Sequence, residues 1–230
     1  VAPLFTSSFT IKDLLLGALA GIFGAGGLGI FYRGLVRGPM SLVAPLTATT
    51  SAGVPVIWDL SKGQQPGFIC GVGILLAFVA IFTATRGQPN HGASISTSAI
   101  LEALLAGIGF GLFFCVLSET STGSAPWPIV AGRTSAAVVL LASAAVRKVS
   151  IKPTGSWLTL LACSICDTGA NVAFLFALRY GQLGPVAVLA SLYPAVTVLL
   201  ARFALGENLD RRRIAGLLIT LVAITLIAWG

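Results

Sequence analysis

Long apolar runs, separated by short polar connectors, make up almost the whole of this chain. Most runs are close to the roughly 20 residues that a helix needs to cross the ~30 Å hydrocarbon core of a bilayer. They are apolar on every face, whereas barrel strands alternate polar and apolar positions, so the pattern favours helices. The sequence therefore predicts an all-α, polytopic membrane helix bundle of about eight segments, at 13–35, 39–58, 66–85, 98–118, 127–146, 155–178, 184–204 and 212–229.

Composition supports a membrane protein. Only 9% of the residues are charged and 56% are hydrophobic, against about 25% charged in a soluble domain, and the mean hydropathy is +0.97. The net charge of +7 does not indicate nucleic acid, because Lys and Arg lie at segment ends and form no stripe interleaved with aromatic residues. We expect membrane lipid, and no nucleic acid, among the partners.

Lys and Arg in short loops also bear on orientation, because they are enriched on the cytoplasmic side. Of the 14 basic residues, ten lie in or beside the first, third, fifth and seventh connectors and four lie on the opposite side. The ten are Arg33, Arg37, Arg86, Arg147, Lys148, Lys152, Arg202, Arg211, Arg212 and Arg213. This bias predicts that those connectors are cytoplasmic and that both chain ends are outside.

The chain contains an internal repeat, in which residues 31–81 reappear as 174–224 at an offset of 143 residues. Glycines stay aligned in this register: Gly38, Gly63 and Gly73 meet identical residues in the later copy. Segment 13–35 then matches segment 155–178, which comes five segments later. Because each segment crosses the membrane once, a shift by an odd number of segments places the second copy in the opposite orientation. Inverted repeats are typical of secondary transporters.

The repeat predicts one membrane domain with two parts, residues 1–86 as a first, incomplete repeat and residues 87–230 as the second. The second copy has segments 98–118 and 127–146 ahead of the segment that matches 13–35. We therefore expect two further helices upstream, in a fold of ten helices.

Several stretches carry a family resemblance: LASLYPAVTVLLARFALGE (189–207), RIAGLLI (213–219), FLFALRYG (174–181) and RTSAAVVLL (133–141). They resemble the EamA-type transporters of the drug/metabolite transporter superfamily. The resemblance implies a ten-helix, two-repeat carrier in the cytoplasmic (inner or plasma) membrane. Such carriers export or exchange small metabolites, amino acids or drugs, often against protons.

This chain departs from the family pattern in some places. We expect two front helices to be missing from it; in addition, Lys62-Gly63-Gln64 stands where the second copy has Gly206-Glu207, and Ser51 stands in place of Pro194. Relatives usually have cytoplasmic termini, against the charge count, so the orientation stays open.

Asp167 is the first candidate for a functional side chain, because an ionisable group within a membrane helix is costly and is a functional hypothesis by default. It lies near the middle of segment 155–178, and Asn171 follows one turn later on the same helix face. If that face lines a cavity, Asp167 holds a coupling proton or pairs with a cationic substrate. The alternative is a structural Asp satisfied by Asn171, Thr168 or a neighbouring helix.

Three further residues are candidates for substrate or proton binding. Arg133 lies about one turn inside its segment, where it either snorkels to the interface or contacts an anionic substrate. Glu102 is near the start of segment 98–118, where a carboxylate suits a helix N-terminus and coupling is the alternative. Tyr193 either lines a substrate path or packs against a neighbour.

No catalytic residue, cofactor or metal is predicted. Cys70, Cys115, Cys163 and Cys166 all fall inside apolar segments, and the single histidine, His91, lies in a connector. Structural zinc needs four ligands, so we interpret the cysteines as packing residues. No G-x-x-x-x-G-K-[ST] motif is present, which excludes ATP as an energy source within the chain.

The predicted function is a secondary transporter that moves small metabolites, amino acids or drug-like molecules by alternating access, with proton coupling and a homodimer kept as options. An intramembrane enzyme is disfavoured because the only histidine, His91, lies in a polar connector and the acidic residues show no paired arrangement. A non-transporting scaffold, receptor or inactive remnant is the alternative. Two glycine pairs, Gly17 with Gly21 and Gly107 with Gly111, fit the small-xxx-small pattern of close helix contacts.

Overall fold

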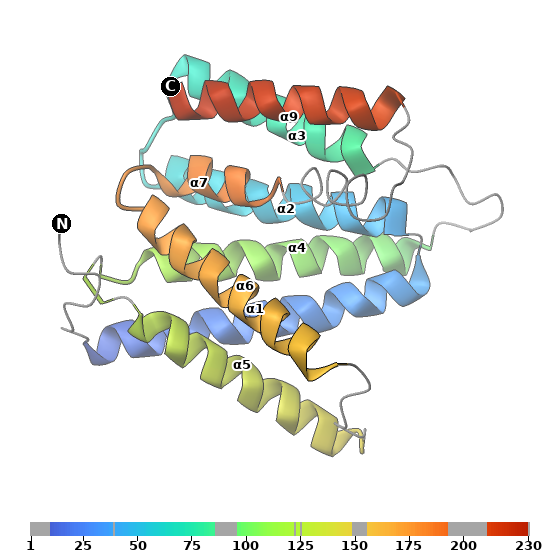
Figure 1. Ribbon diagram of the computed structural model, residues 1–230, viewed down its shortest axis with the longest axis vertical. Helices are drawn as coiled ribbons and strands as arrows, with labels where there is room; N and C mark the ends of the chain where they lie inside the picture. Colours follow the sequence, from blue (N-terminus) through green and yellow to red (C-terminus); the bar gives the residue numbers. More distant parts are fainter. Residues whose placement is uncertain are drawn as a thin grey trace. The chain divides into compact units, whose positions relative to one another are not determined.

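The computed structural model describes residues 10–38, 40–85, 96–121, 123–124, 126–148, 156–192 and 211–229. Within these residues all regular structure is helical, in eight helices (Figure 1). They are α1 (Ile11–Arg37), α2 (Met40–Ser61), α3 (Phe68–Thr85), α4 (Thr97–Ser118), α5 (Trp127–Val146), α6 (Trp157–Ala177), α7 (Leu183–Ala190) and α9 (Arg211–Trp229). The predicted all-α class is confirmed.

Among the described helices, α1, α4, α5 and α6 are long and apolar enough to cross a membrane. Two shorter apolar stretches, Phe68–Ala80 in α3 and Ile214–Ile227 in α9, accompany them. The chain is therefore a multi-pass helical membrane protein.

One predicted element differs. The segment at 184–204 was expected to be one helix, but α7 ends at Ala190 and a turn follows at Ser191 and Leu192. The sequence offers a physical reason, because Pro194 has no N–H to donate to the Ala190 carbonyl four residues earlier. Residues 193–210 lie outside the described part of the chain.

The chain forms two compact units. The first comprises Val1–Ala25 and Phe113–Gly181, and so contains the start of α1, the end of α4, α5 and α6. The second comprises Gly26–Leu112 and Gln182–Gly230, with the rest of α1 and α4 together with α2, α3, α7 and α9.

In the first unit, α1 and α5 approach closely through glycines. A Cβ placed at Gly17 would overlap the backbone of Pro128, and one at Gly21 would overlap the Gly132 carbonyl oxygen. The Ser135 hydroxyl of α5 donates to the Ala18 carbonyl of α1 at 2.7 Å. The predicted close contact at Gly17 and Gly21 is confirmed, since only residues without a side chain allow this backbone approach.

In the second unit, α3 lies along α9 and α2 lies along α7 (Figure 1). Their shared core is built largely from small side chains, which let the helix backbones come close. Its buried members are Ala48, Ala52, Cys70, Ile74, Ala77, Ala80, Val188, Leu192, Ala223 and Ile227.

The second predicted glycine pair, on α4, also packs closely. A Cβ at Gly107 would lie 2.5 Å from Thr50 Cβ, and one at Gly111 would lie 2.5 Å from Val54 Cβ, so both glycines pack against α2. The Thr47 hydroxyl of α2 donates to the Ala103 carbonyl of α4 at 3.1 Å.

A glycine ends α2. Gly63 has φ +78°, a left-handed conformation that glycine adopts without steric cost. The Gly63 N–H donates to the Leu60 carbonyl and the Gln64 N–H donates to the Asp59 carbonyl, both at 3.0 Å. This is the Schellman arrangement, in which the last carbonyls of a helix find donors.

Candidate functional site

An ion pair joins α5 and α6 within the first unit. Arg133 Nη1 of α5 lies 2.6 Å from Asp167 Oδ2 of α6, a charge-assisted contact. Asp167 is at the midpoint of the 21-residue α6, so the pair lies near the middle of a helix long enough to cross a membrane. The sequence named the two residues separately, and the structure brings them together.

The Asn171 side chain is hydrogen-bonded to the backbone of Asp167 and not to its carboxylate. Its Nδ2 donates to the Asp167 carbonyl oxygen at 2.8 Å. The side chains of Arg133 and Asp167 are 43% and 62% exposed, because α5 and α6 both have most of their surface outside the unit's interior. Both charges are therefore presented on the surface of the unit, where a third charged group could reach them.

A second charged cluster ties α1 to α4 within the second unit. The Glu102 carboxylate is mostly buried, and its Oε1 pairs with Arg37 Nη1 and lies 3.6 Å from Arg33 Nε. Its other oxygen, Oε2, is buried and has no hydrogen-bond partner within the described residues. The sequence assigned Arg33 and Arg37 only to membrane flanking, so it missed that two cations share one carboxylate.

Two buried acids, Asp13 and Asp59, were not among the predicted site residues. Asp13 Oδ1 accepts from the Ser121 N–H at 2.8 Å, and its Oδ2 accepts from the Thr10 hydroxyl at 2.7 Å. Asp59 Oδ2 accepts from the Gly184 N–H at 2.5 Å, so α2 supplies a cap to the first turn of α7. A lone acid near the end of an apolar run is the signal that could have found both.

Substitution of Asp59 tests this cap. Asp59→Ala leaves the Gly184 N–H buried without its acceptor, so we expect the free energy of unfolding to fall by about 1–3 kcal/mol. Asp59→Asn keeps an oxygen acceptor and should retain most of the stability. Unfolding of the purified protein in detergent measures both. An equal loss in the two variants would show that the negative charge, and not the acceptor, stabilises α7.

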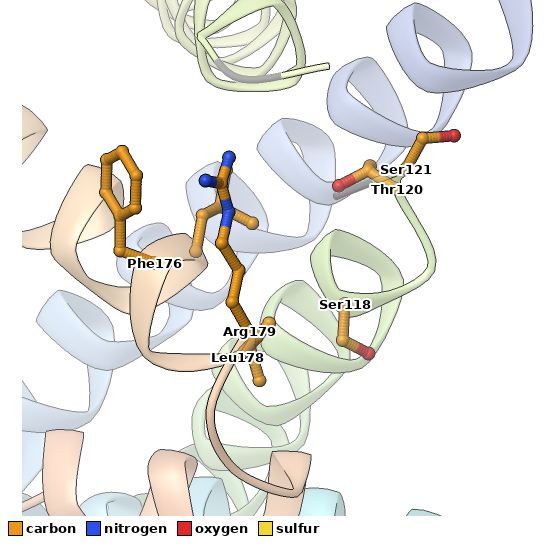
Figure 2. A pocket seen from close by; sticks show the side chains of 7 residues that line it. Ser118, Thr120, Ser121, Phe176, Leu178 and Arg179 are labelled. Atoms are coloured by element: carbon orange, nitrogen blue, oxygen red, sulfur yellow. The ribbon is translucent and has the colours of Figure 1, made fainter. Parts of the chain in front are cut away.

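A small pocket lies where α4 and α6 end, within the first unit (Figure 2). Its volume is about 60 Å³. The walls combine three hydroxyl side chains, one cation and three apolar side chains. They are Ser118, Thr120, Ser121, Arg179, Leu175, Phe176 and Leu178.

The other residues singled out in the sequence are Tyr193 and the four cysteines. Tyr193 lies outside the described residues. Cys70 and Cys115 are buried, but Cys163 and Cys166 are exposed on α6, so the packing interpretation holds only for the first two. Within the described residues no group of three or more His, Cys, Asp and Glu side chains could hold a metal ion.

The sequence profile of the EamA-like transporter family matches residues 97–229, more than half of the chain. The chain belongs to the EamA-like transporter family. The resemblance inferred from the sequence is therefore confirmed. Within this EamA-like protein the matched region contains Glu102, Arg133 and Asp167.

The fold of this EamA-like protein is also similar to that of a solved crystal structure. The two agree with a TM-score of 0.67 at 12% sequence identity, over 95% of this chain and 86% of the other. At this identity the similarity is one of fold alone. A search of curated proteins finds no match to this sequence.

Proposed function

We propose that this EamA-like protein is a secondary transporter of the cytoplasmic membrane that moves small metabolites, amino acids or drug-like molecules by alternating access. The observation that carries the proposal is the Arg133–Asp167 ion pair near the middle of α6. Charged groups at membrane depth are costly and mark substrate and ion pathways. Membership of a transporter family favours transport over an intramembrane enzyme and over a non-transporting scaffold.

In this proposal Arg133 and Asp167 can each exchange the other for a charged partner from the substrate or for a proton. An anionic group of the substrate replaces Asp167 at Arg133, while a proton or a cationic group takes the place of Arg133 at Asp167. Each charge keeps a partner at every stage, so no lone charge is left in the membrane. Asn171, bonded to the Asp167 carbonyl, positions this part of α6.

We assign Glu102 a different role. Two arginines already hold its carboxylate, so Glu102 ties α1 to α4 and does not bind substrate. Tyr193 stays a candidate for the substrate path.

Two features of the second unit support alternating access between related halves. Helix α2 begins at residue 40 and α7 at residue 183, while α3 begins at 68 and α9 at 211. Both offsets are 143 residues, the offset of the sequence repeat. The helices matched in this way pack against each other, α2 with α7 and α3 with α9, as is expected of two repeats that enclose a common path.

Transport in proteoliposomes tests the proposal. The full protein is reconstituted, a pH gradient is imposed, and uptake of radiolabelled amino acids and of a cationic dye is followed. We expect at least one probe to move, and we expect Asp167→Asn to lower its rate at least tenfold because the exchangeable charge is lost.

Glu119→Gln is the matched control, since it makes the same chemical change in the connector after α4 and should leave the rate unchanged. Wild-type rates with an unchanged pH dependence in Asp167→Asn would end the proposed role of Asp167. Failure of the wild-type protein to move any probe would favour the non-transporting alternative.

A further inference from the structure

We propose that Arg33 and Arg37, at the end of α1, bind the phosphate of an anionic phospholipid of the phosphatidylglycerol type. Both arginines lie in the second unit, together with the Glu102 carboxylate that pairs with them. Arg37 is the last residue of α1, Glu102 is near the start of α4, and both helices are long enough to cross a membrane. Because the ends of such helices lie at the level of the lipid headgroups, this cluster lies where phosphates are concentrated.

The charges of the cluster do not balance. Two guanidinium groups share one carboxylate, which leaves one positive charge in excess. The side chains of Arg33 and Arg37 are 55% and 47% exposed, whereas that of Glu102 is 11% exposed. The excess charge is therefore on the outer side of the cluster, and a ligand that neutralises it has to be an anion.

The pairing with Glu102 uses few of the donors that the two arginines carry. Both arginines face the same carboxylate oxygen, Oε1, and Oε2 has no hydrogen-bond partner in the described part of the chain. Arg33 Nε lies 3.6 Å from Oε1, which is too long for a hydrogen bond. Neither arginine therefore makes the bidentate contact that gives a guanidinium its strongest pairing with an oxyanion.

A phosphate group supplies the acceptors that Glu102 does not. A guanidinium has five N–H donors in a planar fork that matches a phosphate bidentately. Arg33 and Arg37 are four residues apart in α1, so they lie on the same face of the helix. Both guanidinium groups can thus reach one phosphate while Arg37 keeps its contact with Glu102.

The surroundings of the cluster favour a lipid over a soluble anion. Val36, between the two arginines, and Leu101, beside Glu102, are exposed apolar side chains. Leu105 is also exposed and lies one turn further along α4, towards the middle of this membrane-spanning helix. The acyl chains of a lipid held at the arginines would cover these side chains, which a soluble phosphate would leave uncovered.

Charge also selects the class of lipid. The phosphatidylglycerol headgroup carries one negative charge, which matches the single positive charge in excess. The phosphatidylethanolamine headgroup has the same phosphate but adds an ammonium group, which the excess positive charge repels. Basic residues at the ends of membrane helices attract anionic lipids in this way.

Native mass spectrometry of the full, detergent-purified protein tests the proposal, with phosphatidylglycerol and phosphatidylethanolamine of identical acyl chains offered together. We expect the wild-type protein to retain phosphatidylglycerol about tenfold better than phosphatidylethanolamine. Arg33→Gln should lower phosphatidylglycerol binding about fivefold or more. Lys12→Gln is the matched control, because it removes one positive charge from the opposite end of the same helix, and it should bind phosphatidylglycerol like the wild type.

Glu102→Gln tests the charge count by a change in the opposite direction. It removes the carboxylate that competes with the lipid for both arginines, so we expect phosphatidylglycerol binding to increase about fivefold or more. If this variant fails to fold, Arg33→Lys takes its place, since it keeps the charge, loses the planar fork and should bind less than the wild type. Equal wild-type binding of the two lipids, or phosphatidylglycerol binding that Arg33→Gln leaves unchanged, would overturn the proposal.

Inorganic phosphate distinguishes the two sources of this phosphate chemistry. It offers the same oxygens without acyl chains, and we expect it to displace phosphatidylglycerol only at a large excess. Displacement at concentrations equal to those of the lipid would show that the arginines take a free anion, and the lipid proposal would then be wrong. The readout is binding to the purified protein, so its result is independent of whether the protein transports a substrate.

Discussion

Replacing either Arg133 or Asp167 by leucine is expected to lower the free energy of unfolding by about 3 kcal/mol, whereas replacing both is expected to cost little. A single substitution leaves one uncompensated charge within a membrane helix, either Asp167 at the middle of α6 or Arg133 nearer the start of α5. On insertion scales such a charge costs roughly 2.5–3.5 kcal/mol. The double substitution leaves two apolar side chains in contact, which a bilayer tolerates.

The measurement is a double-mutant cycle of unfolding free energies in lipid bicelles. Charge reversal, with Arg133→Asp and Asp167→Arg combined, is the matched control and should recover most of the stability lost by either single reversal. A coupling free energy below about 0.5 kcal/mol would mean that the two side chains act independently, which contradicts the structure.

The same cycle separates a structural role of the ion pair from a functional one. We expect the double leucine variant to fold but to lose transport in the proteoliposome assay, because the proposed exchange needs both charges. A double leucine variant that is folded and fully active would show that transport does not use the ion pair.

Gly21→Ala and Gly29→Ala make the same change in the same helix and are expected to shift stability in opposite directions. A Cβ at Gly21 would overlap the Gly132 carbonyl oxygen and the Ser135 hydroxyl, so α1 and α5 would have to separate. Overpacking of this kind costs roughly 1–3 kcal/mol. A Cβ at Gly29 meets nothing within 4 Å, so that variant should gain up to about 1 kcal/mol of helix propensity.

Thermal unfolding of both variants in one detergent measures this difference. Gly26→Ala is a second control, since a Cβ there also meets nothing within 4 Å, and it should behave like Gly29→Ala. If Gly21→Ala were as stable as Gly29→Ala, the close approach of α1 and α5 would be wrong.

Some of the candidate site could be read from the sequence. Asp167 and Arg133 stand out because a charged residue inside an apolar run is rare and costly. What could not be read is that they pair with each other, because the contact depends on how α5 packs beside α6. The structural alternative for Asp167 included a neighbouring helix as its partner, but it named neither α5 nor Arg133.

Other contacts were inaccessible for the same reason. Asp59 and Gly184 are 125 residues apart in the chain, and Asp13 and Ser121 are 108 apart. No periodicity or spacing relates such positions. The pocket around Arg179 is likewise made by two helix ends that only tertiary packing brings together.

Patterns along the chain were sufficient to identify an all-α, multi-pass membrane protein of the EamA-like family, and they predicted most helix limits and two close glycine contacts. Run length, composition and small-residue spacing are local properties, and a bilayer converts them directly into helices. Helix packing was needed to show that Asp167 pairs with Arg133 and that Glu102 is shared by Arg33 and Arg37. It also showed that α7 ends at Ala190 and that α2 caps its first turn. Which charge meets which depends on how helices distant in the chain pack, and no stretch of sequence records that.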